Sequence, residues 1–479
     1  MRTALRTAVA ALTSTMAVTG PTFAARAEPA PVITCQGKPT SVVGTTGTEG
    51  DDVMVVVPQE GVVAQAFGGN DTICIVAAPE GGIRSVIVDA GAGDDAVVNE
   101  STDVDGVWYT TVLGVGADSY VGLDAVIPDD PRATPFRETV HAGQRDLARG
   151  GLDGSLDTEV DVIDTRGGDD VVHSGSTQPG ARNDDIILTG DGDDTVEWAG
   201  EQGGSGALDL GAGDNALGVH PGWQGTSTMV SGPARAALVD GRTVLRWAGT
   251  VTRYDMTVET RDQVFAGTNA DETLVVPAPR AGRPDSQTTG GRRVITMGGG
   301  DDHLVLHSMG NGRVDGGPGR DSYSGSACSV ATVRIGGDFD CVPRAGIAER
   351  HSFGFDDFED LLVEGGDVTV LGSDADEKVK VVATERIRVR GRGGDDVLNA
   401  NTSARLRGDD EVVLSGGPGA DRVVGSPARD RLLGGGGADT LFGDGRGDVI
   451  LGGPGRDKAH GQQGRDRCSA EVRRTCERR

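Results

Sequence analysis

Short apolar runs alternate with glycine- and aspartate-rich turns along most of the chain. The stretches DAGAGDDAVV from Asp89, DTRGGDDVV from Asp164 and MGGGDDHLVL from Met297 each lead from one apolar run into the next through a G-D-D turn. Glycine permits the positive φ of a tight turn, and a short apolar run suits a strand whose alternate side chains point inward. The pattern therefore predicts an all-β chain of short strands joined by tight turns.

From Gly416 onward the pattern becomes strictly periodic. This segment divides into six blocks of nine residues, GGPGADRVV, GSPARDRLL, GGGGADTLF, GDGRGDVIL, GGPGRDKAH and GQQGRDRCS. Each block offers a turn over its first six residues and a strand over its last three, so two blocks form one coil. The eighth residue of a block is expected to point inward, and the sixth is always aspartate: Asp421, Asp430, Asp439, Asp448, Asp457 and Asp466.

Stacked turns of this kind offer oxygen ligands for a metal ion. Odd-numbered blocks stack on one edge and even-numbered blocks on the other, with successive coils about 4.8 Å apart. A carboxylate from each turn, with the carbonyl oxygens that glycine leaves exposed, can supply the oxygen ligands that calcium takes. The full pattern G-G-x-G-x-D stands in the odd-numbered blocks, whereas the even-numbered blocks lose glycines at Ser426, Ala428, Arg446 and Gln462. The sequence therefore predicts a strong edge and a weak edge.

The residues predicted to bind calcium follow from this pattern. A complete G-G-x-G-x-D also stands alone upstream and forms a separate candidate. In the nonapeptide blocks the residues are Gly416, Gly417, Gly419, Asp421, Asp430, Gly434, Gly435, Gly437, Asp439, Asp448, Gly452, Gly453, Gly455, Asp457 and Asp466, and in the upstream candidate they are Gly316, Gly317, Gly319 and Asp321.

The nonapeptide blocks resemble the hemolysin-type (RTX) calcium-binding repeats, in which G-G-x-G-x-D-x-U-x has an apolar residue at U. The resemblance implies a parallel β-roll with calcium held between turns by the glycines and aspartates just named. The segment CQGKPTSVVGTTGTEGDDVMVVV near the N-terminus is similar to the start of exported actinobacterial proteins of this family. The expected fold is all-β, a right-handed parallel β-helix or β-roll solenoid with Gly/Asp-rich turns.

Upstream of the nonapeptide blocks the turns recur at wider spacing. Asp71 and Asp95 are 24 residues apart, as are Asp170 and Asp194, which suits the longer coils of a β-helix. Aspartate after glycine is common in any tight turn, so structural turns and metal sites both remain open there. The predicted regions are a signal peptide over 1–27, an RTX-like repeat region over 28–98, a degenerate solenoid over 99–390, and the nonapeptide β-roll with a Cys-containing end over 391–479.

The first residues predict export. Arg2 and Arg6 precede a mostly apolar stretch, and Ala25-Arg26-Ala27 is a small-residue cleavage site. No later run approaches the roughly 18 to 20 apolar residues that span a bilayer. The protein is therefore expected to be secreted and extracellular, with no membrane span.

The charge of the chain narrows the choice of partners. The 479 residues carry a formal net charge of -28, with 73 acidic and 45 basic side chains. This charge disfavours binding of nucleic acid or anionic bilayers and favours binding of cations. Calcium is therefore the expected cofactor. Glycans and extracellular proteins are further candidate partners. Arginines interleave with the aspartates of the nonapeptide blocks, and we predict that some of them pair with these carboxylates and partly replace the ion.

Six cysteines in an exported chain favour disulfides. They fall as Cys35 and Cys74, Cys328 and Cys341, and Cys468 and Cys476. Six cysteines allow 15 pairings. Pairing of nearest neighbours is the one that would fasten the N-terminal region, a central loop and the end of the roll.

Motifs of common enzyme classes are missing. The sequence contains neither H-E-x-x-H nor G-x-S-x-G, and its glycine clusters enter short β runs rather than helices. A carbohydrate-active enzyme, a β-helix lyase or epimerase with a calcium-binding tail, is the alternative, and FGFDDFEDLL offers it the carboxylates Asp356, Asp357, Glu359 and Asp360. The favoured interpretation is a non-enzymatic calcium-binding protein with a structural or surface-interaction role.

Overall fold

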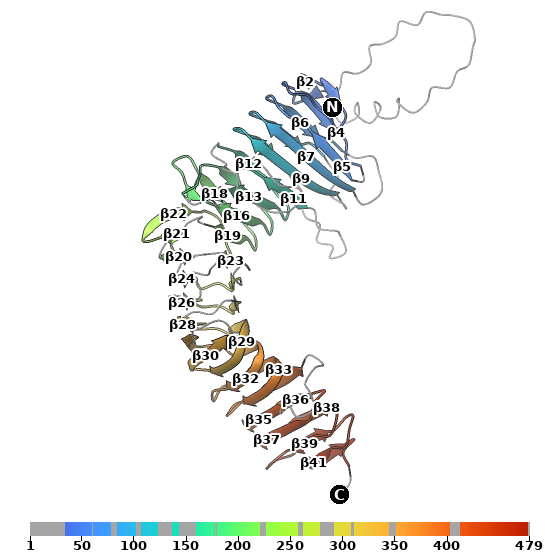
Figure 1. Ribbon diagram of the computed structural model, residues 1–479, viewed down its shortest axis with the longest axis vertical. Coiled ribbons are helices and arrows are strands. Elements are labelled where there is room, and N and C mark those ends of the chain that lie inside the picture. Colours follow the sequence, from blue (N-terminus) through green and yellow to red (C-terminus); the bar gives the residue numbers. More distant parts are fainter. Residues whose placement is uncertain are drawn as a thin grey trace, which may run out of the picture.

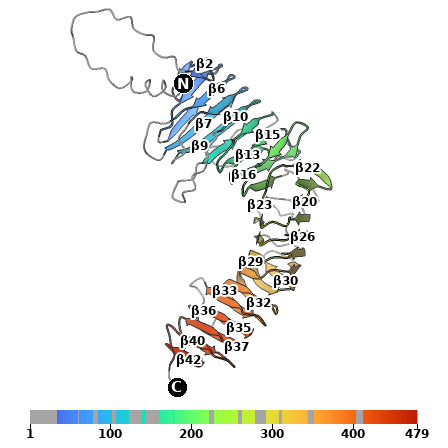
Figure 2. The ribbon, with the colours of Figure 1, turned by 180° about the vertical axis from the view of Figure 1, so that it is seen from behind.

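The computed structural model describes residues 34–59, 61–77, 84–101, 107–122, 137–142, 160–176, 178, 180–220, 227–256, 262–277, 292–307, 311–343, 351–402 and 412–477. The predicted signal peptide lies outside these residues. Every regular element in the described part of the chain is a β-strand. Figures 1 and 2 show the strands stacked in an elongated, bowed rod, with the first strands at one end and the last at the other. The all-β solenoid predicted from the sequence is confirmed.

In the N-terminal half, consecutive strands alternate between two parallel sheets. For example, β4 pairs with β6 in sheet one, while β5 pairs with β7 in sheet two. Sheet one contains, in spatial order, β3 (Val42–Val43), β4 (Val53–Val56), β6 (Thr72–Ile75), β8 (Ala96–Asn99), β10 (Ser119–Val121), β12 (Val162–Asp164), β15 (Ile186–Leu188) and β18 (Ala207–Asp209).

Sheet two continues through the whole rod. Its strands pair in parallel, so the same face is built from residues far apart in the chain. In spatial order they are β5 (Val62–Gln65), β7 (Arg84–Ala92), β9 (Val107–Val115), β11 (Arg137–His141), β13 (Val171–Gly175), β16 (Thr195–Ala199), β19 (Ala216–His220), β23 (Arg253–Met256), β25 (Thr273–Val276), β27 (His303–Leu306), β29 (Ser322–Arg334), β32 (Asp360–Leu371), β33 (Lys378–Arg390), β34 (Val397–Thr402), β36 (Arg422–Ser426), β38 (Thr440–Asp444), β40 (Lys458–His460) and β42 (Val472–Arg474).

A third row of strands faces sheet two in the C-terminal half. The long strands β29, β32 and β33 run through both rows. The row consists of β20 (Ser227–Ser231), β24 (Asp262–Ala266), β26 (Arg292–Thr296), β28 (Asn311–Asp315) and β31 (His351–Asp356), and then, beyond the long strands, of β35 (Val412–Pro418), β37 (Asp430–Gly436), β39 (Val449–Leu451) and β41 (Arg467–Ser469).

Antiparallel strands interrupt the coils at two places. One is the hairpin of β20 with β21 (Ala236–Val239) and β22 (Arg242–Arg246), and the other joins β29 to β30 (Gly337–Pro343) and β31. Tyr323 packs against Phe355 and Phe339 inside the second, with ring centroids 5.0 and 5.7 Å apart. Shorter pairs are β1 (Thr34–Cys35) with β2 (Lys38–Pro39), and β14 (Arg182–Asn183) with β17 (Glu201–Gln202).

In the C-terminal roll, residues 412–477, each strand from β36 to β40 buries a single apolar side chain. Val423, Leu441 and Ala459 lie in register on β36, β38 and β40, and each is fully buried. Leu432 and Ile450 also lie in register, on β37 and β39, and both are fully buried. These are the eighth residues of their blocks, so the inward direction predicted from the nonapeptide period is confirmed.

Disulfides fasten both ends of the described rod. Cys35 is bonded to Cys74, and Cys468 is bonded to Cys476, as nearest-neighbour pairing predicts. Cys341 is also disulfide-bonded. The side chain of its predicted partner, Cys328, lies outside the described part of the structure.

Candidate metal centre

A column of buried aspartates runs through the odd-numbered turns of the roll. Asp421, Asp439 and Asp457 are each at most 2% exposed. The backbone N–H of Asp421 donates to Oδ1 of Asp439 over 2.9 Å, and that of Asp439 donates to Oδ1 of Asp457 over 3.1 Å. The N–H of Asp457 donates in turn to Oε2 of Glu471 over 2.7 Å. Each carboxylate is therefore fixed by the coil before it, and we call such a series a carboxylate column.

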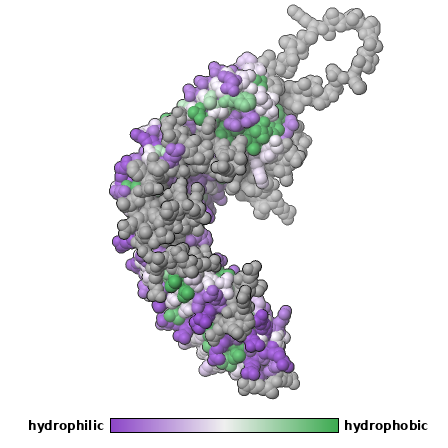
Figure 3. Space-filling model, viewed as in Figure 1, coloured by the Kyte–Doolittle hydropathy of each residue, from purple (hydrophilic) through white to green (hydrophobic). Residues whose placement is uncertain are grey.

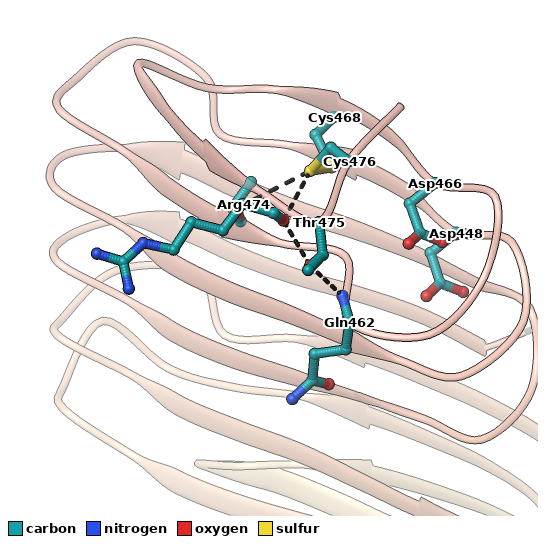
Figure 4. Close-up of a disulfide and its surroundings, with 8 residues drawn as sticks. Asp448, Gln462, Asp466, Cys468, Arg474, Thr475 and Cys476 are labelled. Atoms are coloured by element: carbon teal, nitrogen blue, oxygen red, sulfur yellow. Dashed lines mark hydrogen bonds between the residues drawn. A yellow bond between two sulfur atoms is a disulfide. The ribbon is translucent and has the colours of Figure 1, made fainter. Parts of the chain in front are cut away.

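The even-numbered turns contain a second carboxylate column. The N–H of Asp430 donates to Oδ1 of Asp448 over 2.9 Å, and that of Asp448 donates to Oδ1 of Asp466 over 3.0 Å. Figure 4 shows the carboxylates of Asp448 and Asp466 one above the other, beside the Cys468–Cys476 disulfide. The edge predicted to be weak thus has the same backbone-to-carboxylate contacts as the strong edge.

One oxygen of most of these carboxylates is buried without a hydrogen-bond partner. The other oxygen, Oδ1, is occupied by the N–H of the preceding coil. A buried polar atom left without a partner costs about 1–3 kcal/mol, and more when it is charged. A proton or a bound cation would offset this cost. In the roll the unpartnered oxygens are Oδ2 of Asp421, Asp439, Asp448, Asp457 and Asp466.

The first glycine of each block makes room for this oxygen. A Cβ atom added to Gly434 would lie 2.2 Å from Oδ2 of Asp439, and one added to Gly416 would lie 2.0 Å from Oδ2 of Asp421. The second glycine is needed for another reason, because Gly435 has φ +134° and its added Cβ would meet the carbonyl oxygen of Gly417 at 1.8 Å. The structure thus brings the predicted glycines and aspartates of each odd-numbered turn together.

A comparison with known families decides what these turns are. The family model of the RTX calcium-binding nonapeptide repeat (4 copies) matches residues 415–445 and 442–471. Residues 415–471 are RTX calcium-binding nonapeptide repeats. No curated protein matches the chain significantly. The chain therefore contains a segment of calcium-binding repeats at residues 415–471.

The donor atoms of the RTX repeats fit calcium. Calcium takes 6–8 oxygen ligands, including backbone carbonyls, whereas structural zinc is held by groups of Cys and His. In the described part of the chain no three His, Cys, Asp or Glu side chains are grouped so that they could hold a metal ion. Every RTX turn except that of Asp430 instead offers one unpartnered carboxylate oxygen close to backbone carbonyls. Carbonyl oxygens of the glycine-rich turns would therefore have to complete the coordination.

Burial raises the pKa of several carboxyl groups in the RTX repeats. It raises the pKa of Asp421 to about 6 and that of Asp448 to about 8. The N–H donated by the preceding coil lowers these values, while like charges on neighbouring aspartates, such as Asp439 beside Asp421, raise them further. Close packing of carboxylates therefore disfavours their simultaneous ionisation when no cation is bound.

The prediction that arginines pair with these aspartates is wrong. Arg422, Arg429 and Arg431 are exposed, whereas Asp421 and Asp430 beside them in the sequence are buried. In the described residues 412–477 the ion pair is that of Arg465 Nε with Glu477, at 3.3 Å. The reason is the alternation of the turn, because the sixth residue points inward while the fifth and seventh point to solvent.

Asp430 differs from the other aspartates of the RTX repeats. The backbone N–H of Ser426 donates to its Oδ2 over 2.5 Å, and the Ser426 hydroxyl donates to its Oδ1 over 2.9 Å. Both carboxylate oxygens are thus satisfied by the turn itself. Ser426 stands where the repeat pattern has a glycine. It provides the hydrogen bonds to the first carboxylate of the even-numbered column.

The same pair of hydrogen bonds is found at the first carboxylate of three other columns. A serine or threonine four residues before the acidic side chain donates both its N–H and its hydroxyl to the carboxylate. The pairs are Thr48 with Asp52, Thr268 with Glu272, and Ser373 with Glu377.

Carboxylate columns extend far upstream of the RTX repeats. The N–H of Asp71 donates to Oδ1 of Asp95 over 2.8 Å, and that of Asp170 donates to Oδ1 of Asp194 over 2.9 Å, which confirms the longer coils predicted from their spacing. The upstream candidate is part of such a column, since the N–H of Asp302 donates to Oδ1 of Asp321 over 2.9 Å. Its Gly316 faces Asp321 as Gly416 faces Asp421.

The doubled aspartate of the upstream turns has two separate roles. The second aspartate belongs to the buried column, as Asp170 and Asp194 do. The first is half-buried at Asp169 and exposed at Asp193. It binds the coil on the other side, because Asp169 Oδ1 accepts the N–H of Asp193 over 3.0 Å, and Asp193 Oδ1 accepts the N–H of Asp214 over 2.8 Å. The G-D-D turn is therefore held to both of its neighbours by aspartate side chains.

Several members of the columns were not identified from the sequence. Asp118 accepts the N–H of Asp95, and Asp161 accepts that of Asp118. Asp185 and Asn215 accept those of Asp161 and Asp194. The spacing of 23 residues from Asp95 to Asp118 and of 24 from Asp161 to Asp185 is the signal that could have found them.

Proposed function

We propose that the protein is a secreted calcium-dependent solenoid with a structural or surface-interaction role, in which calcium is held between stacked turns of the RTX repeats. The observation that carries this proposal is the set of five buried Oδ2 atoms without partners, in register, inside those repeats. A bound calcium ion neutralises such carboxylates and supplies a coordination centre for them. The chain's own part is to hold each Oδ1 through the preceding coil, so that Oδ2 keeps its position.

The extracellular location rests on the predicted signal peptide, the disulfides and the calcium requirement. Cys35–Cys74 and Cys468–Cys476 suit an oxidising compartment. The described residues contain no helix with the length and apolarity needed to cross a membrane. Calcium is plentiful outside cells, and metal binding stabilises the folded state that provides the site.

A binding role is favoured over catalysis by what surrounds the carboxylates of the enzyme alternative. Asp356 forms an ion pair with Arg313 at 3.1 Å, and Asp360 pairs with Lys378 at 3.1 Å and with Arg320. Glu359 Oε2 accepts the N–H of Asp321 over 2.8 Å. These three side chains hold neighbouring coils together.

Calcium titration by calorimetry with parallel circular dichroism tests the proposal. The wild-type chain is compared with the triple variant Asp421→Asn, Asp439→Asn and Asp457→Asn, which removes the odd-numbered column's charge but keeps the shape of the side chains. We expect calcium-dependent heat and a gain of β signal in the wild type, and loss of most of both in the variant.

The matched control replaces exposed acidic side chains, as Asp338→Asn, Asp374→Asn and Glu385→Gln. It removes the same charge from the surface of the rod and should leave the titration unchanged. A wild-type chain that is fully folded in chelator and takes up no calcium would overturn the proposal. Equal losses in the two triple variants would show that only the overall charge matters.

A further inference from the structure

The C-terminal roll separates its charges, with acidic groups inside and basic groups outside. Of the nine acidic side chains in residues 412–477, six are the buried aspartates, and Asp444, Glu471 and Glu477 are exposed. All ten Lys and Arg side chains of this segment are exposed. The surface of the roll is therefore basic although the chain carries a formal net charge of -28. In Figure 3 the C-terminal end of the molecule is largely hydrophilic.

Arginines form a regular row on one face of the roll. On five adjacent strands, β33, β35, β37, β39 and β41, the register places Arg388, Val413, Arg431, Val449 and Arg467 side by side. Arginine thus recurs at every second coil. Since adjacent strands are about 4.8 Å apart, successive arginines of the row lie roughly 9–10 Å apart.

The turns leading into these strands add further arginines. Arg429 and Arg465 stand two residues before Arg431 and Arg467 in their blocks. Arg446 belongs to the turn between them, and its carbonyl oxygen lies against Gly464 of the next even-numbered turn. The arginine face is defined here as Arg429, Arg431, Arg446, Arg465 and Arg467. The ion pair of Arg465 with Glu477 is highly exposed and leaves the face basic.

We propose that the arginine face binds a linear acidic polysaccharide that lies along the axis of the solenoid. Guanidinium groups bind carboxylate and sulfate oxygens through paired hydrogen bonds. A straight row with a constant interval suits an extended polymer whose charges also recur at a constant interval. This inference rests on the proposed calcium-stabilised fold and on the proposed extracellular location, where such polymers are the available polyanions.

Other polyanions suit this face less well. Single-stranded nucleic acids bind through aromatic side chains on which bases stack. The row instead contains Val413 and Val449, and the next row on the same strands contains Leu433 and Leu451. The large negative charge of the rest of the chain opposes approach to a DNA duplex or an anionic bilayer, both of which extend well beyond the roll.

The experiment measures binding by calorimetry in excess calcium at about 0.15 M ionic strength, where exposed charges are screened beyond about 8 Å. The probes are a sulfated dextran oligosaccharide and the neutral dextran of the same length. We expect the sulfated probe to bind and the neutral one not to bind. The variant R429Q/R431Q/R467Q should bind the sulfated probe at least about tenfold more weakly, because it loses three charge-assisted contacts.

The matched control is R456Q/K458Q/R473Q, which removes three positive charges from the odd-numbered edge and the opposite sheet. Its affinity should stay within about twofold of the wild type, because exposed charges away from the site contribute little. Circular dichroism and calcium titration of each variant separate loss of the face from loss of the fold. Equal weakening in the two variants, equal affinity for a DNA duplex or anionic vesicles, or no binding by a folded, calcium-loaded wild type would overturn the proposal.

Discussion

The N-terminal coils and the RTX roll use the same carboxylate column but surround it with very different amounts of apolar core. From Asp71 to Asp95 a coil spans 24 residues, and from Asp421 to Asp439 it spans 18. Among described residues the first coil buries Ile73, Cys74, Ile75, Val86, Val88 and Ala90, while the second buries Val423, Ala428 and Leu432. The second also contains two buried aspartates, Asp421 and Asp430. The roll therefore depends more heavily on whatever neutralises its carboxylates.

The residue before the buried aspartate also differs between the two regions. In the N-terminal coils it is polar and binds the next coil, since Asn70 Oδ1 accepts the N–H of Asp94 over 3.0 Å. In the roll it is alanine or glycine, as at Ala420 and Gly447, or an arginine such as Arg429. The exposed hydrogen bonds of the upstream turns are thus replaced by a basic surface. The comparison teaches that the buried aspartate builds the solenoid, while its neighbour decides what the edge presents to solvent.

Removal of calcium should give the largest difference between the two regions. Five unpartnered oxygens in the roll, at about 1–3 kcal/mol each, oppose folding around a thin core, whereas the N-terminal coils set a larger apolar core against the unpartnered oxygens of Asp71 and Asp95. We therefore expect chelator to expose the amides of residues 412–477 to hydrogen exchange while those of β4, β6 and β8 stay protected. Hydrogen exchange followed by mass spectrometry checks this, and protection of the roll that is equal with and without chelator would contradict it.

A single methyl group placed at the first glycine of a block should act next most strongly. Gly434→Ala sets a Cβ 2.2 Å from Asp439 Oδ2, and overpacking of this kind costs about 1–3 kcal/mol. Gly436→Ala, in the same turn, meets nothing within 4 Å and is the matched control. Thermal melts in excess calcium should show a lower Tm for the first variant only. Equal melting temperatures would mean that the carboxylate is not where the structure places it.

The pH dependence of stability in chelator sharpens the same comparison. Burial raises the pKa of Asp448 to about 8 and that of Asp95 to about 7. A folded-state pKa above the unfolded value means that the folded state binds more protons, so stability is present at low pH and is lost as pH rises through the folded pKa. The calcium-free roll should therefore lose stability up to about pH 8, and the N-terminal coils up to about pH 7. Melts that improve with rising pH would contradict this sign.

The smallest effect is expected at the serine that starts the even-numbered column. Ser426→Ala removes the hydroxyl that donates to Asp430 Oδ1 and accepts the N–H of Ala428 over 3.1 Å. Loss of such a hydrogen bond costs about 1 kcal/mol. Ser469→Ala, at an exposed position of β41, should be neutral. Urea unfolding in calcium measures both variants, and a neutral Ser426→Ala would show that the column needs no closed end.

The roll could be predicted from the sequence because its nine-residue period determines which residues face inward and which turns stack on the same edge. With nine residues in each block, the inward direction of Val423 and Leu441 and the alternation of the two edges both follow. The outward direction of Arg429 and Arg431 follows from the same alternation, but charge neutrality of the segment suggested pairing instead. Net charge does not record which side of a strand a residue occupies.

The rest could not be predicted because it depends on which coils become neighbours. Asp118 and Asp161 are 43 residues apart, yet they are consecutive members of one column. Ser426 and Thr268 look like departures from a glycine pattern until the order of the coils shows that each starts a column. The hairpins of β21 and β30 have the same apolar runs as solenoid strands, and only their antiparallel pairing sets them apart.

Each N–H to carboxylate contact between aspartates of the roll joins an aspartate to the aspartate two blocks later. The repeating structural unit of the roll is therefore two blocks. Removing residues 434–451 would set Asp421 beside Asp457 and Asp430 beside Asp466, so every remaining aspartate would keep a neighbour of its own edge. Removing only the first block, residues 416–424, would set Asp430 beside Asp396 and place Ser426 in the middle of the odd-numbered column. Changes of length by 18 residues are therefore compatible with the fold, whereas changes by nine are not.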